Sequence, residues 1–472
     1  ENKHYIKFLS RVYLQNDSND RALHVVNKIL DLKDITVDDL YFAARLHIDH
    51  GSYKKGIHIL DRIENRIGIN EGLSLEKYQV LLKNEAYDEA EEELKKLIEQ
   101  YPQHGDYYVF LGDFYFEKGN KKKALSTYEK SREIDPDNGK VLFSLANYYM
   151  KEGDNQKFKE YLFKAFSSEE IDIQSKMQRF MPFVANKGKN DNPLTNEDII
   201  RIFDTLIQEH PDEARIYGAY GNFLVEENME DDALRLFDQA LELDARKVDL
   251  WKEYLFLLSS VNNNDLLYEK SSEAITFFPN EPLFRLFQGV SLFQKDKLEA
   301  AAKTMEKGLS DVDDNQGLKG RLHSYLGDIY HSLDSIEKCF NHYEKALEID
   351  QNNVIVLNNY SYYLAVCNQD LDKAERMSSK TVELNPGNPT YLDTYAWVLF
   401  KKGDYSQAQF IIERAIDNMD EPSGVILEHY GDILFKNGKV DQAVKKWEEA
   451  LKYEDHSDLL QEKINQKTYI DE

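Results

Sequence analysis

The chain has 472 residues, and its 86 acidic side chains against 59 basic ones leave a formal net charge of −27. A protein that binds nucleic acid by releasing phosphate counterions needs a basic face, so this charge balance argues against nucleic acid as a partner. Hydrophobic residues make up 42% of the chain without any long apolar run, so we expect a folded protein and no transmembrane helix.

Residues 1–170 are expected to form an N-terminal array of helical hairpins, of which Asp106–Asn138 is the clearest. In that stretch, two helical stripes of apolar and small residues flank a turn at Gly119-Asn120. The second helix should end at Asp135, because the residue before a proline is disfavoured in helical geometry. One such hairpin cannot bury both of its stripes, so it needs a copy on each side.

Copies of this hairpin recur along the chain with a period of 34 residues, which separates Pro102 from Pro136 and Gly119 from Gly153. This period and residue pattern resemble the tetratricopeptide repeat (TPR) family. The resemblance implies an all-α, right-handed α-solenoid of about thirteen helix-turn-helix repeats that ends in a C-terminal capping helix.

The pattern changes in residues 171–211, which we interpret as an irregular repeat or a joint. Helices are expected at Ile171–Ala185 and Thr195–Gln208, with a loop between them. Residues 212–455 should form a C-terminal array, with an insertion of about four residues near Asp311–Gly317. Residues 456–472 should form the capping helix and a tail.

No catalytic motif stands out, since the chain has no phosphate loop, no nucleophile elbow and no Cys-x-x-Cys pair. His47 and His50 are spaced to share one helix face, but no third metal ligand is evident. We therefore predict a protein without catalytic residues, metal or cofactor. One alternative stays open, an enzyme with its site in residues 171–211. A cluster of buried His, Asp or Glu there would support it, and an apolar filling would end it.

A second helical stripe on the first helix of each repeat, about 100° from the core stripe, is the candidate binding surface. The resemblance implies that this stripe lines a concave groove. The predicted protein-binding residues are Asp328, Asp393, Trp397, Phe400, Glu428, Asp432 and Phe435. Exposed aromatic residues beside carboxylates suit a basic or amphipathic peptide. In the alternative interpretation the acids are ordinary solvated residues and Trp397 packs on the neighbouring helix.

The sequence does not match the carboxylate clamp of chaperone-binding TPR proteins, because Phe143 and Gly218 stand where that clamp has lysine. Residues 388–416 and 422–452 are similar instead to the C-terminal repeats of TPR lipoproteins from the envelope of bacteroidete-type bacteria. That similarity implies export, a lipid anchor on a cysteine that would precede Glu1, and a place on the periplasmic side of the outer membrane. There the chain would serve an assembly or secretion complex. A cytoplasmic TPR adaptor of the co-chaperone kind is the alternative.

Overall fold

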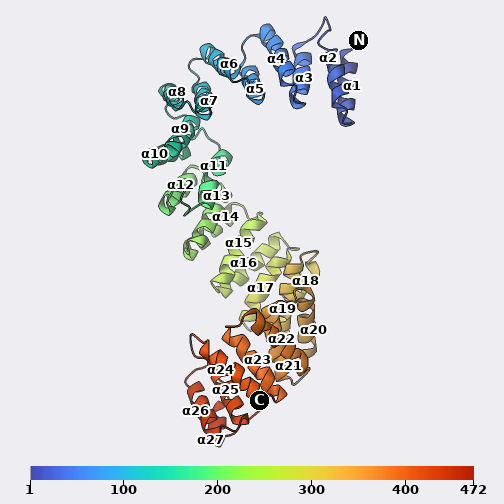
Figure 1. Ribbon diagram of the computed structural model, residues 1–472, viewed down its shortest axis with the longest axis vertical. Helices are drawn as coiled ribbons and strands as arrows, with labels where there is room; N and C mark the ends of the chain where they lie inside the picture. Colours follow the sequence, from blue (N-terminus) through green and yellow to red (C-terminus); the bar gives the residue numbers. More distant parts are fainter. Residues whose placement is uncertain (1, 472) are drawn as a thin grey trace. The chain divides into compact units, whose positions relative to one another are not determined.

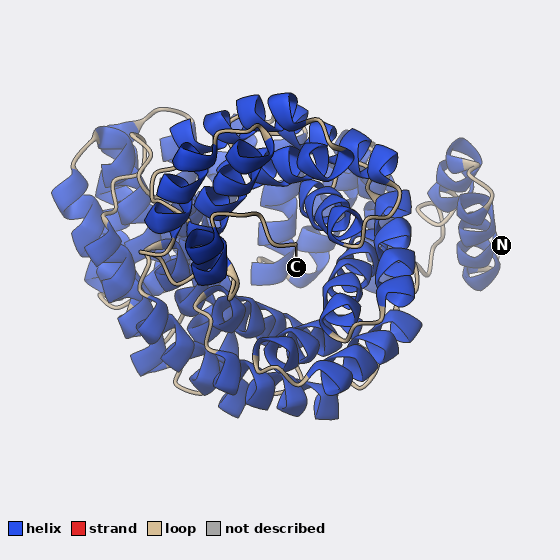
Figure 2. Ribbon diagram, turned by 90° about the horizontal axis from the view of Figure 1, so that it is seen from below, coloured by secondary structure: helices blue, strands red, loops and turns tan. Residues whose placement is uncertain are grey.

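The computed structural model describes residues 2–471, and none of these residues lies in a β-strand. Figures 1 and 2 show helices joined by loops. Glu1 and Glu472, the outer limits of the predicted arrays, lie outside the described residues. Within this range the chain divides into two compact units, one ending at Phe223 and the other beginning at Leu224. The boundaries predicted after residues 170, 211 and 455 stay predictions.

The first unit contains twelve helices and most of a thirteenth: α1 (Lys3–Gln15), α2 (Asn19–Asn27), α3 (Val37–Asp49), α4 (Tyr53–Ile67), α5 (Glu71–Lys83), α6 (Tyr87–Gln100), α7 (Gly105–Glu117), α8 (Lys121–Ile134), α9 (Gly139–Glu152), α10 (Asn155–Phe166), α11 (Ile173–Ala185), α12 (Asn196–Glu209) and α13 (Ala214–Glu226). The second unit continues with α14 (Glu230–Leu243), α15 (Val248–Ser260), α16 (Asn264–Phe277), α17 (Pro282–Gln294), α18 (Leu298–Asp311), α19 (Gln316–Ser332), α20 (Ile336–Ile349), α21 (Val354–Val366), α22 (Leu371–Leu384), α23 (Pro389–Lys402), α24 (Tyr405–Asp417), α25 (Gly424–Lys436), α26 (Val440–Ala450) and α27 (Leu460–Gln466). The described range thus holds thirteen consecutive helix pairs followed by one short helix, which confirms the predicted helical-repeat fold.

The turn inside each hairpin carries the repeat period in its backbone. A residue with positive φ stands in these turns at Asp17, Gly51, Glu85, Gly119 and Gly153, each 34 residues after the one before it. Glycine and aspartate tolerate this left-handed geometry better than most residues. The period therefore holds even in the N-terminal repeats, where the apolar pattern is degenerate. In the second unit the step from Asp296 to Asp334 is 38 residues, as expected from the predicted insertion of about four.

Close helix contacts inside three hairpins depend on a glycine that faces an aromatic ring. A Cβ atom added to Gly112 would lie 2.4 Å from Tyr128, and Gly327 faces Tyr343 at the same distance. Gly431 faces Trp447 in the same way. The aromatic side chain belongs to the second helix of each pair and is fully buried. Any larger residue would push the two helices apart.

The helices predicted for the irregular region are present as α11 and α12, and their contact is apolar. Phe180 of α11 lies edge-on to Phe203 of α12, with ring centroids 4.8 Å apart. Ile199, Ile202 and Leu206 of α12 are fully buried. This filling does not fit an enzyme site in residues 171–211. In the range covered by the structure, no helix is both long and apolar enough to cross a membrane.

Candidate protein-binding groove

A cavity of about 240 Å³ lies along the first helices of the last three repeats, α21, α23 and α25. Residues beyond α26 complete its wall. Its lining side chains include Val366 of α21, Trp397 and Lys401 of α23, Glu428, His429 and Asp432 of α25, and Ser457, Lys463 and Tyr469 of the segment after α26. The cavity thus lies on the stripe that the sequence predicted to line a groove.

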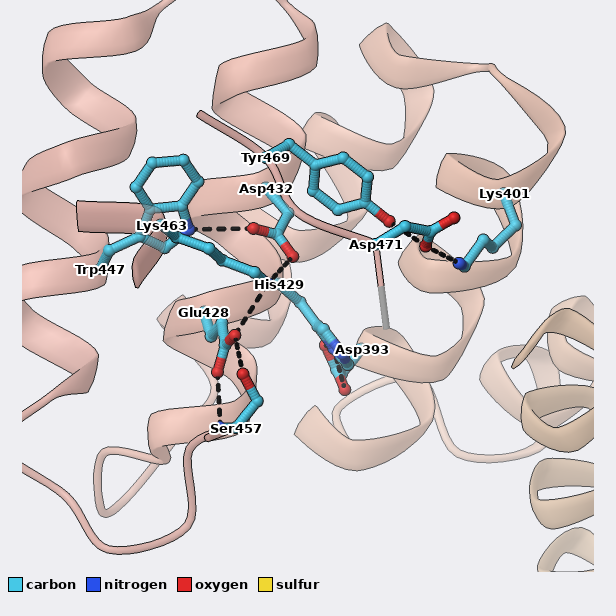
Figure 3. A network of polar contacts seen from close by, with 10 residues as sticks. All are labelled: Asp393, Lys401, Glu428, His429, Asp432, Trp447, Ser457, Lys463, Tyr469 and Asp471. Atoms are coloured by element: carbon cyan, nitrogen blue, oxygen red, sulfur yellow. Dashed lines mark hydrogen bonds and ion pairs between the residues drawn. The ribbon is translucent and has the colours of Figure 1, made fainter. Parts of the chain in front are cut away.

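Two carboxylates of α25 hold a buried ammonium group at this groove (Figure 3). Lys463 Nζ lies 2.8 Å from Glu428 Oε1 and 2.8 Å from Asp432 Oδ2, and its side chain is only 2% exposed. The backbone N–H and the hydroxyl of Ser457 donate to Glu428 at 2.8 and 2.5 Å. The indole N–H of Trp447 donates to Asp432 at 3.0 Å. Each carboxylate is therefore satisfied within the chain.

Burial and this ion pairing set the protonation of the three groups. Burial alone would lower the pKa of Lys463, but Asp432 and Glu428 hold it above its ordinary value. Burial alone would raise the pKa of Glu428, but Lys463 and Ser457 hold it below its usual range. Burial raises the pKa of Asp432 to about 6 against the attraction of Lys463. At neutral pH the site therefore holds one ammonium between two carboxylates.

Aromatic rings form the other wall of the groove. The Trp397 ring stacks on His429 at 4.0 Å between centroids and on Phe400 at 4.8 Å. Trp397 is 8% exposed, and its indole nitrogen has no hydrogen-bond partner among the described residues. His429 Nδ1 lies 2.9 Å from Asp393 Oδ1. Although burial lowers the pKa of His429, the Asp393 carboxylate raises it above its ordinary value.

The segment after α27 covers this aromatic wall. Tyr469 meets Phe400 edge-on, with ring centroids 5.3 Å apart. Its hydroxyl donates to Asp471, and Asp471 pairs with Lys401 Nζ at 2.7 Å. In Figure 3, dashed lines join Tyr469 to Asp471 and Asp471 to Lys401.

The structure brings together five of the seven predicted site residues: Asp393, Trp397, Phe400, Glu428 and Asp432. The expectation that the groove aromatics are exposed is wrong, because the chain's own segment covers them. Trp397 packs on the neighbouring helix through His429, as the alternative interpretation had it. The alternative that these acids are solvated is wrong as well, since Asp393, Glu428 and Asp432 are buried. Their role in binding a partner stays a prediction.

Asp328 and Phe435 lie apart from the groove. Asp328 accepts hydrogen bonds from the Tyr343 hydroxyl and from Asn359 at 3.1 Å, within its own and the next repeat. Phe435 packs beside Trp447, with ring centroids 6.0 Å apart. Both side chains therefore have structural contacts in the solenoid.

Sequence reasoning missed Lys463, Ser457 and Tyr469, which come from the region interpreted as a polar cap. One signal was available for Lys463. It lies three residues after Leu460 and next to Ile464, so it falls on the packed face of the short helix. A lysine on such a face is expected to meet an acid of the helix it packs against.

Some buried polar groups lie outside the groove. In the irregular region the fully buried Lys176 has its Nζ 3.3 Å from His210 Nε2. Across the described residues, no cluster of three or more His, Cys, Asp or Glu side chains is placed to hold a metal ion.

Models of the tetratricopeptide repeat family match residues 75–139 and 323–353. The chain is 20% identical over 395 residues to the TPR repeat-containing protein YpiA of Bacillus subtilis, which covers 82% of this chain and 88% of that protein. It is 25% identical over 220 residues to the peroxisomal targeting signal receptor of Candida albicans, covering 44% of this chain and 35% of that receptor. Among solved structures, the Cut9–Hcn1 hetero-tetramer of the APC/C aligns over 99% of this chain and 97% of its own, with 13% identity and a TM-score of 0.45. A tetratricopeptide repeat protein from Parabacteroides merdae aligns over 54% of this chain and 98% of its own, with 13% identity and a TM-score of 0.42.

Proposed function

Because the chain is a tetratricopeptide-repeat protein, we propose that it is a non-enzymatic scaffold whose C-terminal groove binds a basic segment of a protein partner. One observation carries this proposal. Glu428 and Asp432 hold an ammonium group at 2.8 Å beside the Trp397 and Phe400 rings. The groove is thus already complementary to a lysine that is followed by an aromatic residue.

The chemistry of the groove explains this preference. Two carboxylates buried side by side need a cation, because an unpaired buried charge is strongly destabilising. Aromatic faces attract cations and bury apolar area, as Lys401 over the Trp397 ring illustrates at 5.2 Å. An acidic or purely apolar segment that displaced Lys463 would leave the carboxylates unpaired. One relative, the receptor from Candida albicans, is named for recognising a targeting signal, and this use is compatible with peptide binding.

A crosslinking experiment at the groove can identify the partner. A photo-crosslinking amino acid is introduced at one position of the full chain, and the chain is expressed in its source organism. Val366 lines the cavity and is 47% exposed, so it reports on the groove. Phe410 of α24 is 63% exposed and does not line the cavity, so it is the matched control. We expect a protein adduct at position 366 and none at position 410. The adduct should map to a segment with lysine or arginine near an aromatic residue.

Two outcomes would contradict the proposal. Adducts at position 410 without any at 366 would place the partner elsewhere on the chain. Adducts at 366 that map to segments without basic residues would refute the ligand chemistry.

For the setting, we propose a bacterial cell-envelope complex at the periplasmic face of the outer membrane, serving assembly or secretion. The support is the similarity of residues 388–416 and 422–452 to envelope TPR lipoproteins. The alternative is a cytoplasmic adaptor. The reading frame upstream of Glu1 and membrane fractionation separate the two. A signal sequence that ends in a lipid-modified cysteine supports the envelope, and a plain start codon with soluble protein supports the adaptor.

A further inference from the structure

Residues 459–471, which we call the closing segment, are attached to the second unit by polar contacts and by the apolar side chains of Leu460, Ile464 and Tyr469. Of their side chains only Leu460 and Lys463 are buried. Helix α27 is seven residues long and ends at Gln466, and the next residue, Lys467, has a φ of +49°. Residues 468–471 have no regular secondary structure. Without its ion pairs, a segment with so few buried apolar side chains would open at lower free energy than the core.

A partner segment could make the same contacts that hold the closing segment in place. Lys463 supplies an ammonium to Glu428 and Asp432, and Tyr469 supplies a ring to Phe400. Asp471 supplies a carboxylate to Lys401. A lysine followed six residues later by an aromatic residue therefore reproduces the main contacts of the segment.

Opening the segment alone is unfavourable. It would leave Glu428 and Asp432, only 4% and 0% exposed, without their cation. Removing one partner of such a buried pair is strongly destabilising. The groove therefore stays closed until another cation arrives to take the place of Lys463.

We infer that the closing segment is an internal stand-in for the partner, and that a partner segment with the same lysine–aromatic chemistry displaces it. This inference rests on the proposed function of the groove. It names the partner chemistry and adds a competition step. The segment then sets a threshold affinity, because a ligand must bind better than a tethered competitor whose effective concentration is high.

The experiment uses the full chain and a fluorescent peptide with the sequence of residues 457–471. Lys463→Gln removes the ammonium from the groove and should free the segment. Lys467→Gln is the matched control, since Lys467 is exposed on the same segment and carries the same charge. Anisotropy should show that the peptide binds the Lys463→Gln chain at least tenfold more tightly than it binds the wild-type or Lys467→Gln chain. A peptide with glutamine in place of Lys463 should not bind.

A second variant covers the case in which Lys463→Gln fails to fold. Tyr469→Ala removes the ring from Phe400 without leaving a buried charge unpaired, and it should also raise peptide affinity. Hydrogen exchange of both variants should rise in residues 459–471, and in Tyr469→Ala it should stay unchanged in α25 and α26. Three results overturn the inference. They are equal peptide binding by all chains, faster exchange throughout α25 and α26 in both variants, and a dimer in which the segment is exchanged between two copies.

The two proposals fail separately. An adduct at position 366 without peptide binding leaves the proposed function intact and overturns the competition. Peptide binding without any adduct at position 366 supports a displaceable segment, but it refutes the proposal that a protein partner binds in the groove.

Discussion

Replacing Gly112 by alanine tests the physical basis of the repeat most directly. The new Cβ would lie 2.4 Å from Tyr128 Cε1 and 2.5 Å from Tyr128 Cδ1, well inside contact distance. Tyr128 is fully buried, and its hydroxyl donates to Asp113 at 2.7 Å. The ring therefore cannot move aside without losing this hydrogen bond.

The expected change in the free energy of unfolding has three contributions. Overpacking a tight core costs about 1–3 kcal/mol. Losing a hydrogen bond to a charged acceptor costs about 1.5–3 kcal/mol if the ring turns, and the overpacking is then partly relieved. The better helix propensity of alanine offsets about 1 kcal/mol. We therefore expect the variant to be destabilised by about 2–3 kcal/mol.

Native-state hydrogen exchange of the full chain measures this loss locally. Because repeats couple mainly to their neighbours, α7 and α8 should exchange roughly 50-fold faster, at about 1.4 kcal/mol per factor of ten. Gly72→Ala is the matched control. Gly72 also lies in a helix, but the nearest atom to its added Cβ, Asn70 Oδ1, is 3.6 Å away, so this variant should be neutral or more stable. Unchanged exchange in α7 and α8, or a uniform rise over the whole chain, would refute the reasoning.

Three further predictions follow from other contacts. Trp397→Ala, in a chain whose groove has been freed, should weaken peptide binding by about 2 kcal/mol or more, and an anisotropy titration that shows no loss would remove Trp397 as an anchor. Lys77→Met should destabilise α4–α6 by about 3 kcal/mol in hydrogen exchange, because it leaves the buried carboxylate of Glu93, now 2.9 Å from Lys77 Nζ, with only the exposed Lys96 at 3.5 Å as a cation; equal exchange would contradict this. The ring nitrogens of His323 and His342 lie 2.9 Å apart, so at least one histidine must be neutral, and burial lowers the pKa of both to about 4. Since the unfolded chain binds more protons between pH 6.5 and 4, stability is complete above that window and should fall by about 2 kcal/mol between pH 7 and pH 5, after halving for partial exposure. This prediction would be refuted if the stability of α19 and α20, measured by hydrogen exchange, had the same pH dependence in the His342→Gln variant as in the wild-type chain.

The repeat fold was predictable because it depends on local rules that recur. The 34-residue period, the glycine at the helix crossing and the turn residues each leave a mark in the sequence. Where the apolar pattern weakened, as around Asp17 and Glu85, the turn geometry still kept the period. Counting helices needed only these local signals, so the prediction of about thirteen pairs agrees with the structure.

The candidate groove was predictable only in part. Helical spacing identifies which side chains share a face, and it placed Trp397, Glu428 and Asp432 together correctly. Spacing gives no information on what covers that face. The covering residues, Lys463 and Tyr469, lie 31 and more residues along the chain, beyond the reach of a pattern within one helix. The burial of Trp397 therefore had to come from the structure.

The acids that follow the repeat glycines show why only one of them lies in the candidate groove. Asp113, Asp328 and Asp432 each accept a hydrogen bond from an aromatic side chain 15 residues further on, and burial raises the pKa of all three. This shared contact is structural, because it joins the two helices of one hairpin. Asp432 differs in what lies one turn before it. There α25 has Glu428, whereas the equivalent positions before Asp113 and Asp328 are Val109 and Ser324. A second carboxylate four residues earlier on the helix converts a buried acid into a pair that requires a cation, so among these three repeats the groove chemistry arises only in the last.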